Sequence, residues 1–208
     1  MKKIIAAVLL AVICLCCFTA CGSDSPESAF ERGVWSGNEY NNAYLGLRFT
    51  MPEGYVAATD EEMAALMDMS EDVITNYSEF QLKIASLKTI YDAMVSNPTT
   101  GSGTIIMLEN LKLTVGASKL TAQEYADILA EQLAQASVQG YTYDISDGRE
   151  ETLAGEDYYV LPCSLADGVM VQEYYLRRVD GYMLVLCFTG LSDEDMTAMK
   201  GAFAAPEA

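Results

Sequence analysis

Hydrophobic positions along the chain change their spacing several times. After an uncharged apolar run over residues 4–18 and a polar stretch to residue 33, apolar residues recur mainly at every second position or in short unbroken runs. Such patterns predict β-strands that are buried on one or both faces. The predicted strands cover residues 40–55 (as a pair), 88–96, 104–111, 142–145, 149–153, 158–165, 169–178 and 182–189. Ala154-Gly155, Asp167-Gly168 and Asp180-Gly181 separate the late strands and predict tight hairpins.

Helical spacing interrupts these strands. Three acids after Thr59 start one helix, where negative charge favours the helix N-terminus. Thr121 and Glu124 have the form of a capping box, which predicts a helix that continues until Gly140. Residues 71–84 fit helix or strand, with helix favoured. A last helix begins at the cap Ser192 and carries Met196, Met199 and Phe203. Helices segregated from consecutive strands predict an α+β fold, in which helices flank an antiparallel β-sheet.

Two short segments resemble a known family. Residues 44–55 (Tyr-Leu-Gly-Leu-Arg-Phe-Thr-Met-Pro-Glu-Gly-Tyr) are similar to the strand and turn that open PsbP-like domains, with Tyr55 in place of the usual Trp. Residues 153–158 (Leu-Ala-Gly-Glu-Asp-Tyr) resemble the hairpin that leads into their closing meander and terminal helix. The resemblance spans roughly residues 40–203. It implies a PsbP-like α-β sandwich and a non-enzymatic binding or assembly role, and it carries over no functional residue.

The N-terminus has the three parts of an export signal. Lys2 and Lys3 precede the apolar run, which ends in Phe18-Thr19-Ala20-Cys21. That tetrapeptide resembles the lipobox of bacterial lipoproteins, with Phe18 where the family usually has Leu, and the whole chain resembles small lipoproteins of Gram-positive anaerobes. The resemblance implies cleavage before Cys21, lipid on its thiol, and an anchor at the outer face of the cell membrane.

Two other outcomes remain open for this segment. Cleavage after Gly22 would release a secreted protein, and an uncleaved span would need about twenty apolar residues, more than the run offers. Cys14, Cys16 and Cys17 lack a small residue before them and are poorer lipidation sites. The predicted organisation is therefore a signal peptide (residues 1–20), a flexible polar tether (21–33) and a single domain (34–208).

Charge and composition exclude several functions. The chain has 12 basic and 30 acidic residues, and loss of Lys2 and Lys3 leaves a net charge of about −20. Such a surface repels nucleic acid and anionic lipid headgroups. The chain has no histidine, which removes Ser-His-Asp and Cys-His catalysis and imidazole metal sites. No motif predicts a cofactor.

Cys163 and Cys187 are the only cysteines after Cys21. They fall on the outer strands of a predicted three-strand meander. Neighbouring strands lie about 4.8 Å apart, so Cα atoms on next-nearest strands exceed the roughly 7 Å limit for a disulfide. Two buried thiols are favoured, and one disulfide is the alternative for an exported chain.

Each of the remaining candidate sites could have either a functional role or an ordinary structural one. The acidic stretch 144–151 suggests calcium, but Arg149 stands where an EF-hand register requires Gly. Glu150 and Glu156 could form a carboxylate couple of the glycosidase kind. Met63, Met67 and Met69, with Tyr158, Tyr159, Tyr174, Tyr175 and Tyr182, fit either a core or an adaptable binding face. Core packing and solvated hairpins are favoured.

Three functions follow, in decreasing order of preference. The first is a lipid-anchored, non-enzymatic binding or accessory module with another envelope protein as its partner. The second is a small-ligand or metal-ion sensor or carrier. The third is an envelope hydrolase that uses carboxylates, which would require two acids in one concave pocket.

Overall fold

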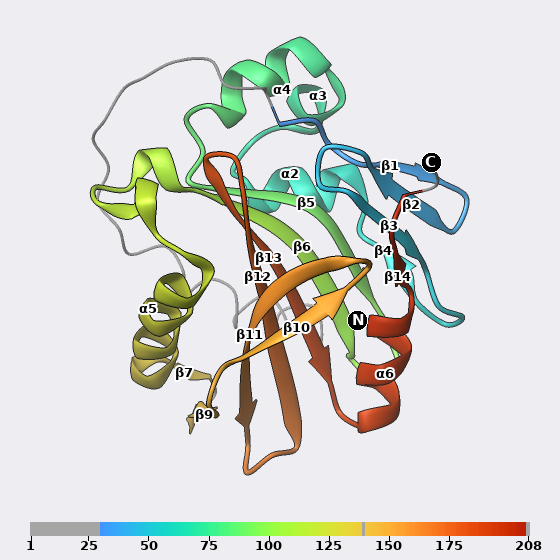
Figure 1. The fold of residues 1–208 in the computed structure, drawn as a ribbon. Coiled ribbons are helices and arrows are strands. Elements are labelled where there is room, and N and C mark those ends of the chain that lie inside the picture. Colours follow the sequence, from blue (N-terminus) through green and yellow to red (C-terminus); the bar gives the residue numbers. More distant parts are fainter. Residues whose placement is uncertain (1–29, 139, 207–208) are drawn as a thin grey trace.

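The computed structural model describes residues 30–138 and 140–206. The predicted signal peptide and Cys21 lie outside the described residues. The largest element is an antiparallel sheet of order β10-β11-β12-β13-β6-β5-β4, with β9 paired to β11 (Figure 1). Its strands are β4 (Val56–Ala57), β5 (Thr89–Ser96), β6 (Gly103–Asn110), β9 (Asp144–Ile145), β10 (Arg149–Leu153), β11 (Glu156–Leu165), β12 (Met170–Val179) and β13 (Tyr182–Gly190).

A second antiparallel sheet packs against the first. Its order is β1-β2-β3-β14, so the last strand of the chain joins three of the earliest. The strands are β1 (Val34–Ser36), β2 (Glu39–Asn42), β3 (Leu47–Thr50) and β14 (Phe203–Ala204); a short hairpin joins β7 (Ser137–Val138) and β8 (Tyr141–Thr142). Aromatic rings connect the two sheets, because Phe203 lies 4.8 Å from Phe49 and 5.4 Å from Phe188 between ring centroids.

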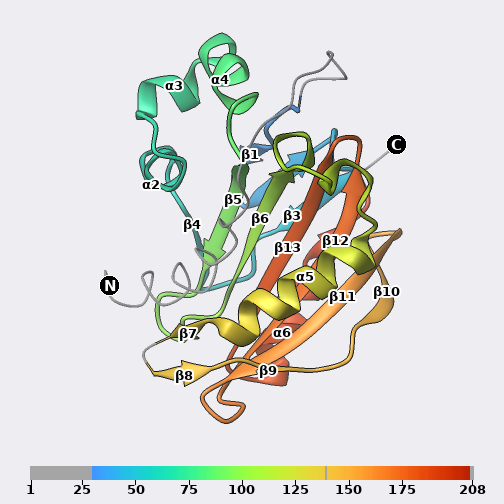
Figure 2. The same cartoon turned by 90° about the vertical axis from the view of Figure 1, so that its left-hand side faces the viewer.

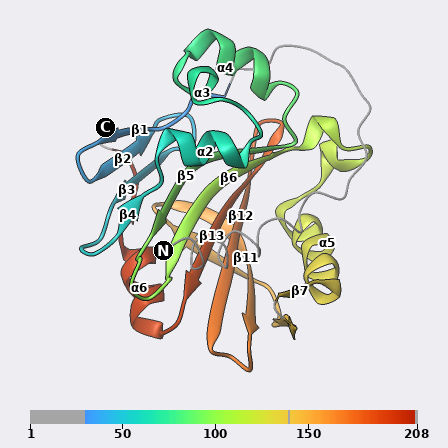
Figure 3. The same ribbon diagram turned by 180° about the vertical axis from the view of Figure 1, so that it is seen from behind.

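Helices lie on both faces and at one edge of the large sheet (Figures 1, 2 and 3). They are α2 (Asp60–Leu66), α3 (Glu71–Thr75), α4 (Tyr77–Ile84), α5 (Ala122–Gln135) and α6 (Asp193–Gly201), with short 3-10 turns at Leu111–Leu113 and Ala117–Lys119. The α5 helix contacts β11 and β12, α6 contacts β13 and β14, and α2 contacts β5. The predicted α+β class is confirmed. Within the described ranges, no helix is long and apolar enough to cross a membrane.

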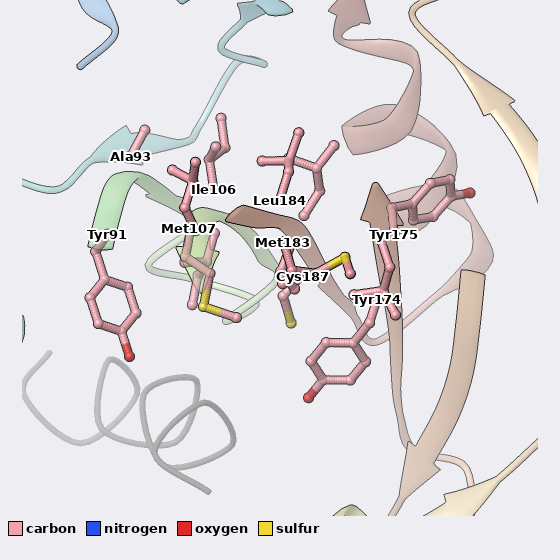
Figure 4. Packing of buried hydrophobic residues seen from close by; sticks show 14 of the residues in the cluster. Tyr91, Ala93, Ile106, Met107, Tyr174, Tyr175, Met183, Leu184 and Cys187 are labelled. Atoms are coloured by element: carbon pink, nitrogen blue, oxygen red, sulfur yellow. The ribbon is translucent and has the colours of Figure 1, made fainter. Parts of the chain in front are cut away.

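Both faces of the large sheet are apolar. Figure 4 shows Tyr91 and Tyr174 on one side of the strands and Ile106 and Leu184 on the other. All four side chains are buried, and every residue of β13 is buried. A sheet that is covered on both faces gives continuous apolar runs rather than strict alternation. The late strands could therefore be recognised from the sequence, but the sequence did not show which residues point to which face.

Local signals placed most elements correctly. Thr121 caps α5 through the predicted capping box, and Thr59 caps α2 in the same way. The Ala154-Gly155 turn has positive φ at both residues, 54° and 83°, as a two-residue type I′ hairpin requires. These signals were readable because each depends on residues close together in the sequence.

Two predicted helix ends were wrong. The α5 helix ends at Gln135, since Ala136 is extended and the chain then forms β7 and β8; Gly140, with a φ of 89°, belongs to the connection between those strands. Phe203 is not helical, because α6 ends at Gly201 and Phe203 pairs with Phe49 in the second sheet. In both cases pairing with a strand ended the helix earlier than the apolar pattern indicated.

Candidate functional site

A pocket of about 370 Å³ lies between the first turn of α5 and the outer strands of the large sheet. Figure 2 shows α5 crossing these strands on the face turned to the viewer. The volume is within the range of small-molecule sites, about 300–1,000 Å³. Its lining includes Gln123, Glu150, Asp157, Tyr159, Leu176 and Arg178. We call it the α5 pocket.

The first turn of α5 closes one side of the α5 pocket. Thr121 Oγ1 accepts a hydrogen bond from the Glu124 backbone N–H at 3.2 Å, and the Glu124 carboxylate accepts one from the Thr121 N–H at 2.8 Å. The backbone hydrogen bond from Thr121 lowers the pKa of Glu124. The capping box thus satisfies the N–H groups of Thr121 and Glu124, which are not available to a ligand in the pocket.

Arg178 forms a basic wall of the α5 pocket. Its guanidinium donates to the carbonyl oxygens of Ser118 at 2.6 Å, Leu120 at 3.4 Å and Asp180 at 3.2 Å. Three carbonyl partners hold the side chain in place and attach the loop before α5 to β12. The guanidinium brings a positive charge and a planar set of N–H donors to this side of the pocket.

Tyr159 supplies an aromatic surface beside this cation. It pairs with Glu150 across β10 and β11, so the two side chains share one face of the sheet. Gly148 makes room for the ring, because a Cβ at that position would lie 2.5 Å from Tyr159 Cε1. A half-buried ring, a carboxylate, a guanidinium and the Gln123 amide suit a small ligand with one apolar face and several hydroxyl or amide groups.

The carboxylate couple suggested by the sequence is not assembled. Glu151 accepts a hydrogen bond from Tyr175 Oη at 2.5 Å, and Glu156 pairs with Arg177 at 3.1 Å. Both acids lie on the sheet face opposite the α5 pocket. Glu150 faces the other way, because successive residues of a strand point to opposite faces. Glu150 and Glu156 therefore cannot act on one substrate bond.

The acidic stretch 144–151 is divided among several structural roles. Arg149 donates to Glu151 at 2.9 Å and to Glu173 at 2.7 Å, and Lys200 of α6 donates to Glu173 at 2.8 Å. Burial raises the pKa of Glu173, but the hydrogen bonds and charges of Lys200 and Arg149 outweigh it and lower that pKa. Across the described ranges, no three His, Cys, Asp or Glu residues are grouped to hold a metal ion.

Cys163 and Cys187 are buried free thiols. They lie on β11 and β13, with Tyr174 of β12 between them and paired directly with Cys187. Burial raises the pKa of the Cys187 thiol to about 12 and raises that of Cys163 further above its usual value. The structure thus has the two buried thiols favoured by the strand spacing, and both are poor nucleophiles at neutral pH.

Most of the methionine and tyrosine candidates belong to the core. Met63 and Met67 are buried and Met69 is half-buried against the core. Of the five tyrosines, Tyr159 alone is half-buried and lines the α5 pocket with its ring held by Gly148. The buried ones are Tyr158, Tyr174, Tyr175 and Tyr182.

Sequence reasoning missed a buried carboxylate, Asp92 of β5. Asp92 sits at an irregularity in the pairing of β5 with β6 and accepts hydrogen bonds from Tyr40 Oη, from Asn42 Nδ2 at 2.7 Å and from the Gly33 N–H at 3.1 Å. The Arg32 guanidinium lies 4.0 Å away. Burial raises the pKa of Asp92, and the hydrogen bonds oppose the shift. The only sign of this site in the sequence is that Asp92 interrupts an otherwise apolar predicted strand.

Glu109 of β6 is a second buried carboxylate that the sequence did not single out. Its side chain accepts a hydrogen bond from Thr89 Oγ1 at 2.5 Å, and 4% of the residue is exposed. Burial raises its pKa to about 7. Asp92 and Glu109 both lie away from the α5 pocket, on the inner strands of the sheet.

Comparisons with known proteins concern the fold alone. The chain matches no protein-family model and no curated protein. It is similar to the solution structure of cyanobacterial PsbP (CyanoP) from Synechocystis sp. PCC 6803. The two chains share 12% sequence identity, and the match covers 88% of this chain and 98% of the other with a TM-score of 0.49.

Proposed function

We propose that this protein is a lipid-anchored binding module at the outer face of the bacterial membrane, where it docks onto another envelope protein. The observation that carries the proposal is Cys21 itself, which follows an uncharged apolar run and two small residues. A polar segment connects it to the domain, whose packing already includes the buried Phe30. A short connection keeps the domain close to the membrane, where envelope partners are concentrated.

Replacing Cys21 with Ser is expected to abolish incorporation of labelled fatty acid and to release the protein into the medium. The reason is that the thiol is the proposed attachment atom and the hydroxyl cannot form the thioether. Metabolic labelling of cells that express each variant measures this. Cys17→Ser is the matched control and should stay labelled, because Cys17 lacks a small residue before it. An unlabelled wild-type protein found in the medium would instead indicate cleavage after Gly22.

The docking part of the proposal requires a second measurement. Crosslinking in intact cells should recover one defined envelope protein with the wild type and much less of it with Cys21→Ser, because anchoring raises the local concentration. If the wild type yields no reproducible crosslink, the docking role is wrong even where the lipid label is present.

Small-ligand binding is the second candidate, and the α5 pocket favours it. Its volume and its combination of Tyr159, Glu150 and Arg178 suit a neutral sugar or an amino acid. In an NMR titration with a panel of monosaccharides and amino acids, binding should shift signals around Tyr159. Tyr159→Ala should weaken binding by roughly five- to twelve-fold, as loss of a ring contact of about 1–1.5 kcal/mol implies. Tyr159→Phe should retain most of it; unchanged spectra across the panel would contradict this role.

A further inference from the structure

The α4 helix has an apolar residue where the domain gives no reason for one. Phe80 and Ile84 form its buried side, whereas Leu82 is 80% exposed. At about 100° per residue, Leu82 points roughly 200° away from Phe80, directly into solvent. Isolated exposed leucines are common, so the surroundings of Leu82 decide whether this one matters.

Leu82 belongs to a shallow hollow of about 360 Å³. The hollow lies over α3 and α4, and its lining is Val73, Glu79, Leu82, Lys83 and Ser86. We call these residues the α3–α4 patch. The lining thus combines two aliphatic side chains with one cation, one anion and one hydroxyl. A combination of apolar and polar groups is what a surface needs for contact with the boundary between lipid headgroups and acyl chains.

The chain enters the domain beside this patch. Gln81, the neighbour of Leu82, donates from Nε2 to the Phe30 carbonyl oxygen at 2.6 Å. The Arg32 guanidinium lies over the Phe80 ring at 5.6 Å. The first described residues are therefore fixed to α4. In Figures 1 and 2, α3 and α4 lie at one end of the molecule and the turn between β11 and β12 at the other.

The length of chain before Phe30 limits how far α4 can lie from a lipid on Cys21. Phe30 lies nine positions after Cys21, and nine residues span at most about 30 Å when fully extended. The patch is thus held near the membrane, whereas the β11–β12 turn is farther away by the length of the long strands. Proximity of this kind makes a surface contact effective even where the free domain binds the membrane only weakly.

We propose that the α3–α4 patch rests on the lipid bilayer, with Leu82 at the acyl boundary. This inference rests on the proposed lipid attachment at Cys21. The contact is apolar rather than electrostatic, since Glu71, Asp72 and Glu79 surround one Lys83 and the whole chain is acidic. Neutral lipids therefore favour it and anionic lipids weaken it.

Site-directed labelling of the lipidated protein on phosphatidylcholine vesicles tests the orientation. An environment-sensitive fluorophore is attached to Leu82→Cys, with Val169→Cys in the β11–β12 turn as the matched control. Both positions are largely exposed, at 80% and 64%, so both substitutions leave the core intact. The buried Cys163 and Cys187 do not compete for the label in the folded protein.

The label at position 82 should shift its emission to the blue and be quenched by lipids that carry a quencher near the headgroups. The label at position 169 should do neither. Adding phosphatidylglycerol should reduce the shift at position 82. Leu82→Asp, followed with a label on Ser86→Cys, should reduce the quenching there, because a charge opposes entry into the boundary.

The outcomes separate this inference from the anchor on which it rests. If the wild type floats with vesicles but the label at position 82 stays as water-exposed as that at 169, the orientation is wrong and the anchor stands. If the wild type does not float, both fail. A label at position 82 that is protected in intact cells but not on vesicles would overturn the inference in favour of a protein on this surface.

Discussion

Replacing Asp92 with Ala is expected to lower the free energy of unfolding by about 3–5 kcal/mol, the usual result of removing one partner from a buried charged network. The carboxylate accepts from Tyr40, Asn42 and Gly33, which belong to the second sheet and the segment before it. Without it, the buried Tyr40 hydroxyl loses its acceptor, the part-buried Gly33 N–H loses its own, and Asn42 Nδ2 keeps only the Glu31 carbonyl oxygen. Each unpaired buried group costs roughly 1–3 kcal/mol. Urea unfolding followed by circular dichroism measures the loss.

Tyr40→Phe is the matched control for Asp92→Ala. It removes one donor and leaves the carboxylate with Asn42, Gly33 and the nearby Arg32, so a loss of about 1–2 kcal/mol is expected. Phe is chosen because it keeps the aromatic ring, which packs tightly against Gly33. A Cβ at Gly33 would lie only 2.2 Å from Tyr40 Cε2. Equal losses in the two variants would show that Asp92 does not organise the network.

Glu109→Gln is expected to remove a pH dependence of stability worth about 3 kcal/mol, since each pKa unit corresponds to about 1.4 kcal/mol. Burial raises the pKa of Glu109 from 4.5 to about 7. Below pH 4.5 the group is protonated in both states and its stabilising effect is complete. As pH rises from 4.5 to 7, the unfolded chain releases the proton first, so the folded state loses that stability.

The measurement is a series of urea unfolding curves for wild type and Glu109→Gln across this pH range. Between pH 4.5 and 7, the free energy of unfolding of the wild type should fall relative to that of Glu109→Gln. Above pH 7 the difference between the two should stay constant. The chain has no histidine, so a change near neutral pH cannot come from an imidazole. Thr89→Val is a useful companion, because loss of the hydrogen bond to Glu109 should raise its pKa further. A constant difference between wild type and Glu109→Gln at all pH values would contradict the assignment.

Sequence patterns located the candidate chemistry only in part. Tyr159 and Glu150 could be noticed as residue types, but their sharing one face with Arg178 depends on the register of β10, β11 and β12. The same register separates Glu150 from Glu156. Asp92 and Glu109 were hidden because an acid within an apolar strand is recognised only when its burial is known.

The sequence by itself determined the features that depend on neighbouring residues. These include the helix start after Thr59, the capping box at Thr121, the Ala154-Gly155 hairpin, the β11–β13 meander and the export-signal pattern before Cys21. Local hydrogen bonds and backbone preferences act over a few residues, so a short window contains the information.

Only the tertiary structure decided which distant segments meet. It placed β13 beside β6, joined β14 to β3, fixed the chain entry at Phe30 to α4 and left Leu82 facing solvent. Such pairings depend on burying apolar surface between segments separated by many residues, and the apolar pattern of one strand fits several neighbours equally well. The orientation proposed for the anchored protein follows from those long-range contacts and not from any motif.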